Sequence, residues 1–154
     1  MTNLDVAYIP TPKIIIRQML LLARLRQGEL LYDLGAGDGR ILIEGTRVFR
    51  AKCVGVEIDP ERVKRLKERL KATNVEAKII QGDLMQVDLS DADVVAIYLS
   101  DSVNAKLSPK LSRELKPGAR VISLDYTIPG WKLEKESSVK SAGLTRKIYL
   151  YSVA

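Results

Sequence analysis

Three acidic side chains stand where predicted strands end, and the first is followed by a turn of alternating glycines. Asp33 closes the apolar run of "LLYDLGAGDGR", Glu57 closes that of "VGVEIDP", and Asp83 closes that of "KIIQGDLMQ". Because parallel strands of an open α/β sheet end at one edge, where ligands bind, these carboxylates should lie together. A carboxylate attracts a cation and accepts hydrogen bonds from hydroxyl and amino groups. The pattern therefore predicts a site for a positively charged ligand that also carries such groups.

The glycine turn narrows the identity of the ligand. Gly35, Gly37 and Gly39 form G-x-G-x-G, whereas the dinucleotide fingerprint needs a glycine at position 40, where Arg40 stands. The chain also contains no Gly-Lys-Ser/Thr sequence of the kind that cradles phosphates. Asp33 beside the turn would repel a pyrophosphate. These features count against a nicotinamide dinucleotide and against a nucleoside triphosphate.

S-adenosylmethionine fits the turn better, because it carries a sulfonium, an ammonium and a carboxylate but no phosphate. Asp33 would bind its amino group directly or attract it through water. The amides of Gly35, Ala36 and Gly37, beside a helix N-terminus, would face its carboxylate. We therefore predict that the first strand end holds the methionine part of this cofactor.

The next two strand ends would hold the adenosine part. Glu57 would accept hydrogen bonds from both ribose hydroxyls, and Ile58 beside it would cover one face of the adenine. Asp83, which follows Gly82, would accept a bond from the adenine amino group, with Leu84 packing nearby. Each acid alone is better explained as a cap or a solvated strand end. The three together, with the glycine turn, favour the cofactor.

The elements that position these residues alternate between strands and helices. A first helix is predicted over residues 12–25, with Thr11 as its N-cap and Pro12 at its first position. The last two predicted strands, residues 132–139 and 146–153, are too close in the sequence for a helical crossover and should pair as an antiparallel hairpin. Strands are predicted over residues 29–35, 52–58, 76–82, 93–99, 119–126, 132–139 and 146–153, and further helices over 40–50, 60–72 and 103–115.

This order predicts one α/β domain over residues 1–154, a doubly wound, Rossmann-like sheet of seven strands. The sheet should be mostly parallel, with the antiparallel hairpin at its C-terminal end. The segments after the third and fifth strands, "MQVDLSDA" and "TIPG", are too short for helices, so the substrate cleft should be open.

Composition excludes several chemistries. With no histidine and a single cysteine, Cys53, the chain has no histidine base, no thiolate metal site and no internal disulfide. The lone cysteine fits a reducing cytoplasm and is expected in the core. No apolar run reaches the ~20 residues of a membrane span, so no membrane attachment is expected. The net charge is +6, but the densest basic stretch, residues 61–71, is better explained as a solvated helix face.

The glycine turn and the strand-end acids resemble those of class I, seven-strand S-adenosylmethionine-dependent methyltransferases. A narrower resemblance, to the small archaeal protein-lysine methyltransferases and their mitochondrial lysine methyltransferase relatives, covers nearly the whole chain. It is carried by "YIPTP" (8–12), "DLGAGDGR" (33–40), "VGVEIDP" (54–60), "IYLS" (97–100), "LSPKLSRELKPGARVIS" (107–123) and "IPGW" (128–131). The resemblance implies transfer of a methyl group from S-adenosylmethionine to lysine ε-amines of proteins.

The resemblance also implies which residues surround the reacting methyl group. Tyr98 and Leu99, at the end of the fourth strand, would lie beside it, where other members hold their substrates, and Tyr98 would also contact the cofactor. Tyr8 would close over the cofactor, and Pro10 and Thr11 of the same segment would also contact the cofactor. For Tyr98 the alternative is ordinary packing at a half-buried strand end, and for Tyr8 a rigid lead-in to the first helix.

Other acceptors and one other class of function stay open. The chain lacks the Asp/Asn-Pro-Pro-Tyr/Phe motif of adenine-N6 enzymes, and Cys53 lies outside the fourth strand, where cytosine-C5 enzymes place their nucleophile. Another RNA methylation, a small-molecule acceptor and a non-catalytic cofactor-binding scaffold are the alternatives. The expected partners are proteins with exposed lysines, including small basic DNA-binding proteins. No direct nucleic-acid binding is required, and the protein is expected to be a monomer.

Overall fold

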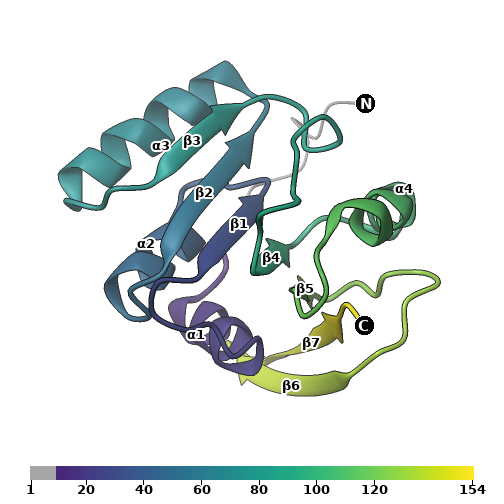
Figure 1. The fold of residues 1–154 in the computed structure, drawn as a ribbon. Helices are drawn as coiled ribbons and strands as arrows, with labels where there is room; N and C mark the ends of the chain where they lie inside the picture. The colour runs from purple at the N-terminus through teal and green to yellow at the C-terminus, as the bar shows by residue number, and fades with distance from the viewer. Residues whose placement is uncertain (1–9) are drawn as a thin grey trace.

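The computed structural model describes residues 10–154, which form a seven-stranded sheet flanked by helices on both faces (Figure 1). The alternation of strands and helices confirms the predicted α/β fold, and most strands are one to three residues shorter at an end than predicted. In chain order the elements are α1 (Lys13–Leu22), β1 (Leu30–Leu34), α2 (Arg40–Arg47), β2 (Lys52–Glu57), α3 (Pro60–Ala72), β3 (Lys78–Gln81), β4 (Val94–Ile97), α4 (Asp101–Glu114), β5 (Arg120–Leu124), β6 (Lys135–Ser141) and β7 (Leu144–Ser152).

The strand order places the carboxyl ends of β1 and β4 in the middle of the sheet. The order is β3-β2-β1-β4-β5-β7-β6, and β1 pairs in parallel with both β2 and β4. β7 pairs antiparallel with β5 and β6, which confirms the predicted terminal hairpin. Because the winding reverses between β1 and β4, the glycine turn after β1 lies at the switch point of the sheet, where ligands bind.

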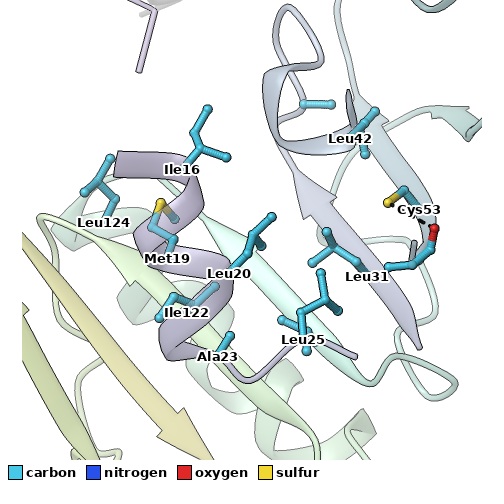
Figure 2. Packing of buried hydrophobic residues seen from close by; sticks show 14 of the residues in the cluster. Ile16, Met19, Leu20, Ala23, Leu25, Leu31, Leu42, Cys53, Ile122 and Leu124 are labelled. Atoms are coloured by element: carbon cyan, nitrogen blue, oxygen red, sulfur yellow. Dashed lines mark hydrogen bonds between the residues drawn. The ribbon is translucent and has the colours of Figure 1, made fainter. Parts of the chain in front are cut away.

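Successive residues along each strand face two different layers. In β4, Val94 joins the core that includes α1, α2 and α3, whereas Val95 joins the core that includes α4. Figure 2 shows Met19 and Leu20 of α1 among the side chains of the first core, near Ile122 of β5. The near-continuous apolar runs of the central strands follow from this burial on both faces.

The α4 face of the sheet is covered by one helix and two loops. In the described chain no helix lies between β3 and β4 or between β5 and β6, as predicted from the short segments there. Leu89 and Ile128 of these loops are buried with Leu107 and Leu111 of α4. These loop residues thus fill the core on this face, and neither loop adds a helix to it.

Side-chain caps set the starts of two helices. Asp59 accepts a hydrogen bond from the Glu61 amide at 3.0 Å, and α3 begins at Pro60 as predicted. Ser100 accepts one from the Val103 amide at 3.2 Å, so α4 begins at Asp101, two residues before the prediction. The charged residues of α3 between its buried positions are exposed, which confirms the solvated face expected there.

The first helix is shorter than predicted. Pro12 is the N-cap residue and α1 begins at Lys13, so the prediction of Thr11 as a capping side chain is wrong. The extended ψ of 145° at Pro12 lies outside the helical region, so the first helical turn starts one residue later. The helix ends at Leu22 because Arg24 adopts a left-handed φ of 57°, which an α-helix cannot contain.

Cys53 is buried, as predicted, and burial raises the pKa of its thiol to about 11, so it stays protonated in the core. Within residues 10–154, no three His, Cys, Asp or Glu side chains gather in a way that could hold a metal ion. Across the same residues, no helix combines the length and apolar character needed to cross a membrane.

Two glycines with the same backbone angle provide a test of how tightly α3 packs on the glycine turn. Gly39 and Gly28 both have φ of 82°, but a Cβ on Gly39 would lie 2.5 Å from Leu66 Cδ1, whereas one on Gly28 would meet nothing within 4 Å. We expect Gly28→Ala to cost about 1 kcal/mol, from backbone strain alone. Gly39→Ala should cost about 2 to 4 kcal/mol, since overpacking adds to the strain. Denaturant unfolding measures both, and equal losses would show that Leu66 moves aside freely.

Candidate active site

A cavity lies at the carboxyl ends of β1 and β4, between the glycine turn and α1. The predicted residues Asp33 and Tyr98 both line it. The full lining is Thr11, Ile16, Asp33, Gly35, Ala36, Asp38, Arg40, Ile41 and Tyr98. The structure thus brings together five of the residues predicted from the sequence. Pro10 is not among the lining residues, and Tyr8 lies outside the described residues.

A second cavity lies on the β2 and β3 side of the turn and shares Gly35 with the first. Its lining is Gly35, Val56, Glu57, Ile58, Gly82, Asp83 and Leu84, which gathers the residues predicted to hold adenosine. Ile58 is 64% exposed, unusual for an isoleucine and suited to covering a flat ring. The Asp83 carboxylate accepts a hydrogen bond from the Met85 amide at 2.9 Å, which orients it.

The glycine turn is held by the neighbouring strand. Gly35 and Ala36 both donate their amides to the carbonyl of Val56, at 2.8 and 2.9 Å. The Gly37 amide donates to Glu57 Oε1 at 3.2 Å. Each of these three amides therefore has a partner within the protein, and their contact with a ligand carboxylate stays a prediction. The left-handed φ values of 84° at Gly35 and 56° at Gly37 explain why both positions are glycine.

Glu57 connects the turn to the end of β2. Its Oε2 accepts from the Asp59 amide at 3.1 Å while its Oε1 accepts from Gly37, and the residue is only 4% exposed. A carboxylate has about four acceptor positions, so the two oxygens retain capacity for hydroxyl donors. The side chain is thereby fixed in place at the mouth of the second cavity.

The carboxyl group of Asp33 has a strongly raised pKa. It is 3% exposed, and burial raises its pKa to about 7, with further increases from the nearby carboxylates of Glu57 and Asp38. A carboxyl group in this state gains most from a cationic ligand, because the ligand's charge offsets both the burial and the repulsion. The first cavity therefore fits a ligand with an ammonium group.

Arg40, together with Asp38, is a cavity residue that the sequence analysis did not assign to the site. Arg40 Nε donates to Asp38 Oδ2 at 2.7 Å, and both residues line the first cavity. Arg40 opens α2, directly after the glycine turn. Its place in "GDGR", next to the turn, was the available signal, since a cation there can bind the carboxylate of a ligand.

The exposed side of the first cavity is aromatic. Tyr98 is 44% exposed, and its ring stacks on that of Tyr126 with centroids 6.3 Å apart. The guanidinium carbon of Arg146 lies 5.3 Å from the Tyr98 ring centroid. Leu99 packs beneath the turn, with Cδ2 3.4 Å from where a Cβ on Gly35 would be. Sequence reasoning found Tyr98 and Leu99 but missed Tyr126 and Arg146.

The sequence model of the ANTKMT methyltransferase domain matches residues 33–135, which contain the glycine turn, all three strand-end acids and Tyr98. The chain belongs to this methyltransferase family. It is 40% identical to a protein-lysine N-methyltransferase of Saccharolobus islandicus, over 96% of this chain and 94% of that protein. It is 32% identical to the adenine nucleotide translocase lysine N-methyltransferase of Mus musculus, over 84% of this chain but only 57% of the mouse protein.

A solved structure extends the likeness to the fold. The RNA methyltransferase from Salinibacter ruber, in complex with S-adenosyl-L-homocysteine, superposes with a TM-score of 0.86 and is 40% identical, covering 94% of each chain. The predicted family, the seven-strand fold and the cofactor are thus confirmed, and this protein is an S-adenosylmethionine-dependent methyltransferase. The acidic, glycine-edged cavities fit that cofactor, since they offer carboxylates to its cation and its hydroxyls.

We expect Glu57→Ala to weaken cofactor binding by roughly 10- to 100-fold while leaving the rate at saturating cofactor within a few-fold of the original. A hydrogen bond to a charged group is worth about 1.5 to 3 kcal/mol, and a ribose contact acts equally before and during the reaction. Calorimetry and initial rates measure the two effects. Unchanged affinity in a folded variant would show that Glu57 serves only the amides of Gly37 and Asp59.

Proposed function

We propose that this protein methylates lysine ε-amines of other proteins. The identity of 40% to the Saccharolobus islandicus protein-lysine N-methyltransferase, along almost all of both chains, supports this acceptor. The geometric support is the cavity that joins Asp33 to the aromatic side chain of Tyr98. The sequence has no histidine, so the acceptor must become nucleophilic without a histidine base.

In this proposal the residues of each cavity bind a different part of the cofactor. Asp33 binds the ammonium group and Arg40 the carboxylate of the methionine part. Glu57 accepts bonds from the ribose hydroxyls, while Asp83 and Ile58 bind the adenine. When bound, S-adenosylmethionine supplies an electrophilic methyl group on a positively charged sulfur. The protein's own contribution is to position the acceptor and to keep water away from it.

Tyr98 and Leu99 act on the acceptor side. A lysine amine is protonated at neutral pH, with an ordinary pKa near 10.4, and a protonated amine has no lone pair to donate. Moving the amine out of water and next to a cation lowers its pKa, which favours the neutral form. The Tyr98 hydroxyl can then accept a hydrogen bond from the amine and orient its lone pair.

The acceptor chemistry predicts the pH dependence of the reaction. At saturating cofactor, we expect the methylation rate to rise steadily from pH 6 to 9, because the neutral fraction of the amine increases with pH up to the lowered amine pKa. Initial rates on a lysine peptide measure this rise. A rate that is flat over this range would mean that loss of the amine proton does not limit the reaction.

We propose proteins with exposed lysines as targets, including small basic DNA-binding proteins, and a monomeric enzyme acting in the cytoplasm. A basic target would meet repulsion from an enzyme of net charge +6. Asp101, the exposed first residue of α4, is a local acid that would offset part of it. Moderate salt should therefore speed methylation of a basic target by screening the remaining repulsion.

A second candidate is methylation of RNA, which the Salinibacter ruber relative favours because it is described as an RNA methyltransferase. One experiment separates the two. Cell extract is incubated with the protein and methyl-labelled S-adenosylmethionine, and the product is divided by protease and nuclease sensitivity. Mass spectrometry of the protein fraction should then find methyl-lysine. Label on nucleobases, with lysines unmodified, would overturn the proposal.

A further inference from the structure

Asp125 has an unusual backbone and an unusual number of partners. It directly follows β5 and adopts φ of 66°, a left-handed conformation that costs about 1 kcal/mol or more for a residue other than glycine. Its amide donates to the Lys147 carbonyl at 2.7 Å, and its Oδ1 accepts from the Lys147 amide at 3.3 Å. The strained residue is thus tied to β7 through both main chain and side chain.

The Asp125 carboxylate holds one particular cation. Arg146 Nε donates to Oδ2 at 2.9 Å and to Oδ1 at 3.2 Å, and Arg146 Nη2 donates to Oδ2 at 2.7 Å. The two side chains are 25% and 17% exposed, so this pair is better shielded from water than an ordinary surface salt bridge. Several hydrogen bonds between a planar guanidinium and a carboxylate fix the orientation of the guanidinium.

The fixed guanidinium lies over the ring of Tyr98, 5.3 Å from its centroid. The same ring stacks on Tyr126, the residue after Asp125, with an angle of 20° between the planes. Tyr126 is itself anchored, because its carbonyl accepts from Ser123 Oγ at 2.5 Å and from Asn104 Nδ2 at 3.4 Å. Both Ser123 and Asn104 are fully buried. Tyr98, which is half exposed at the cavity mouth, is therefore held by groups from β7 and from the segment that directly follows β5.

We propose that the Asp125–Arg146 ion pair, with Tyr126, is a positioning device that fixes the Tyr98 ring as the wall of the acceptor-lysine channel. This inference rests on the proposed function and adds three residues that determine how the acceptor is received. A cation over the face of an aromatic ring is attracted by the ring's electrons, so it holds the ring plane without blocking the hydroxyl. The hydroxyl and the free edge of Tyr98 then face the incoming side chain.

The geometry also favours a neutral acceptor. Because Arg146 already occupies a cation position on Tyr98, a second cation at this ring would be repelled, whereas a neutral amine would not. The Asp125 carboxylate reduces this repulsion by partial neutralisation. The cluster therefore acts mainly by orienting the acceptor, and to a smaller degree by favouring the neutral form of its amine.

The test compares Arg146→Leu with a matched control on the same strand. Lys147, the next residue of β7, forms an exposed ion pair with Glu136 at 3.6 Å, so Lys147→Gln also removes one cation and one ion pair from β7. We expect Arg146→Leu to lower kcat/KM for a lysine peptide by roughly 10- to 100-fold, mostly through KM, with cofactor affinity unchanged. Arg146→Lys should recover part of the loss, because it restores a cation near the ring. Lys147→Gln should match the unaltered protein.

A second readout does not depend on which acceptor is methylated. The ring signals of Tyr98 in the free protein, assigned with Tyr98→Phe, should shift in Arg146→Leu and in Asp125→Asn but not in Lys147→Gln. Asn tolerates the left-handed conformation, so Asp125→Asn removes the charge without adding strain. In a Tyr98→Ala background, Arg146→Leu should cost almost nothing further, since its effect acts through Tyr98.

The outcomes separate the two proposals. If the unaltered protein does not methylate lysine but Tyr98 still shifts in Arg146→Leu, the acceptor is wrong and the positioning role stands. If lysine is methylated while Arg146→Leu matches Lys147→Gln in both kinetics and Tyr98 signals, the positioning role is overturned. Additive losses in the double variant would also overturn it, because they would show that Arg146 acts independently of Tyr98.

Discussion

Replacing Asp33 with Asn should lower the affinity for S-adenosylmethionine by about 100-fold or more and, at the same time, stabilise the protein without cofactor above pH 7. The affinity falls because a buried carboxylate that meets an ammonium group makes a charge-assisted hydrogen bond, which a neutral amide cannot replace. The stability rises because the same carboxylate, without a cation, is buried beside Glu57 and Asp38. One substitution thus has opposite effects on the free and the bound protein.

The sign of the stability effect follows from the raised pKa. Folding moves the pKa of Asp33 from its ordinary 3.8 to about 7, so between these values the folded protein binds more protons than the unfolded chain. Stability therefore falls as pH rises from about 4 to 7, and above pH 7 the full penalty is present. At 1.36 kcal/mol for each pKa unit, the penalty is on the order of 4 kcal/mol, which Asp33→Asn removes.

Cofactor binding should carry the same signature. Below pH 7, binding of a cation to Asp33 must release a proton, so affinity should increase between pH 5.5 and 7.5 in the unaltered protein and stay nearly flat in Asp33→Asn. Calorimetry in two buffers of different ionisation enthalpy detects the released proton directly.

Asp93 is a suitable control, because its pKa is lowered whereas that of Asp33 is raised. Partial burial acts to raise its pKa, but hydrogen bonds from Lys116 and from the Leu30 amide outweigh it and hold the pKa below its ordinary value. Asp93→Asn should therefore destabilise the protein at neutral pH and leave cofactor binding unchanged. If Asp33→Asn also destabilised the free protein at pH 8, Asp33 would have to be a structural acceptor instead of a ligand for the cofactor.

The sequence was sufficient to predict that these acids gather at one edge of the sheet. Asp33 and Glu57 lie at or next to the ends of the buried strands β1 and β2, and Asp83 lies two residues beyond β3. Parallel strands end at one edge of the sheet, which leaves little freedom in where such residues lie. The helix α3 was also predicted to the residue, because Asp59 and Pro60 are strong local start signals.

What the sequence did not predict depends on pairings between distant residues. The sequence did not predict that the amides of the glycine turn donate hydrogen bonds to the Val56 carbonyl and to Glu57. These bonds depend on the register between β1 and β2. Likewise, Arg146 reaches Tyr98 only because β7 pairs antiparallel with β5, which places Arg146 next to Asp125. A residue pattern shows which face a strand buries, and not which side chain from another strand lies opposite.

Tyr98→Ala should reduce kcat/KM for a lysine substrate by about 100- to 1,000-fold, the largest loss of activity that we expect from any residue on the acceptor side. Removing the ring takes away one wall of the cavity and the partner of Tyr126, so water reaches the amine and its protonated form is favoured again. A loss of orientation by even 1 Å can cost about 100-fold. Cofactor affinity should fall much less than kcat/KM, because Tyr98 would supply one contact to the cofactor while Asp33, Arg40 and Glu57 are untouched.

Tyr98→Phe separates the ring from its hydroxyl. The ring can still stack on Tyr126 and lie beneath Arg146, so only the hydrogen bond to the amine is lost, and we expect a loss of roughly 5- to 15-fold, or about 1 to 1.5 kcal/mol. Initial rates at several peptide concentrations and saturating cofactor measure both variants, and thermal unfolding checks their folds. In Tyr98→Ala the rate should also need a higher pH to reach its maximum, because the exposed amine recovers its ordinary pKa. Full activity of a folded Tyr98→Ala variant would show that the ring only packs at the end of β4 and that the acceptor binds elsewhere.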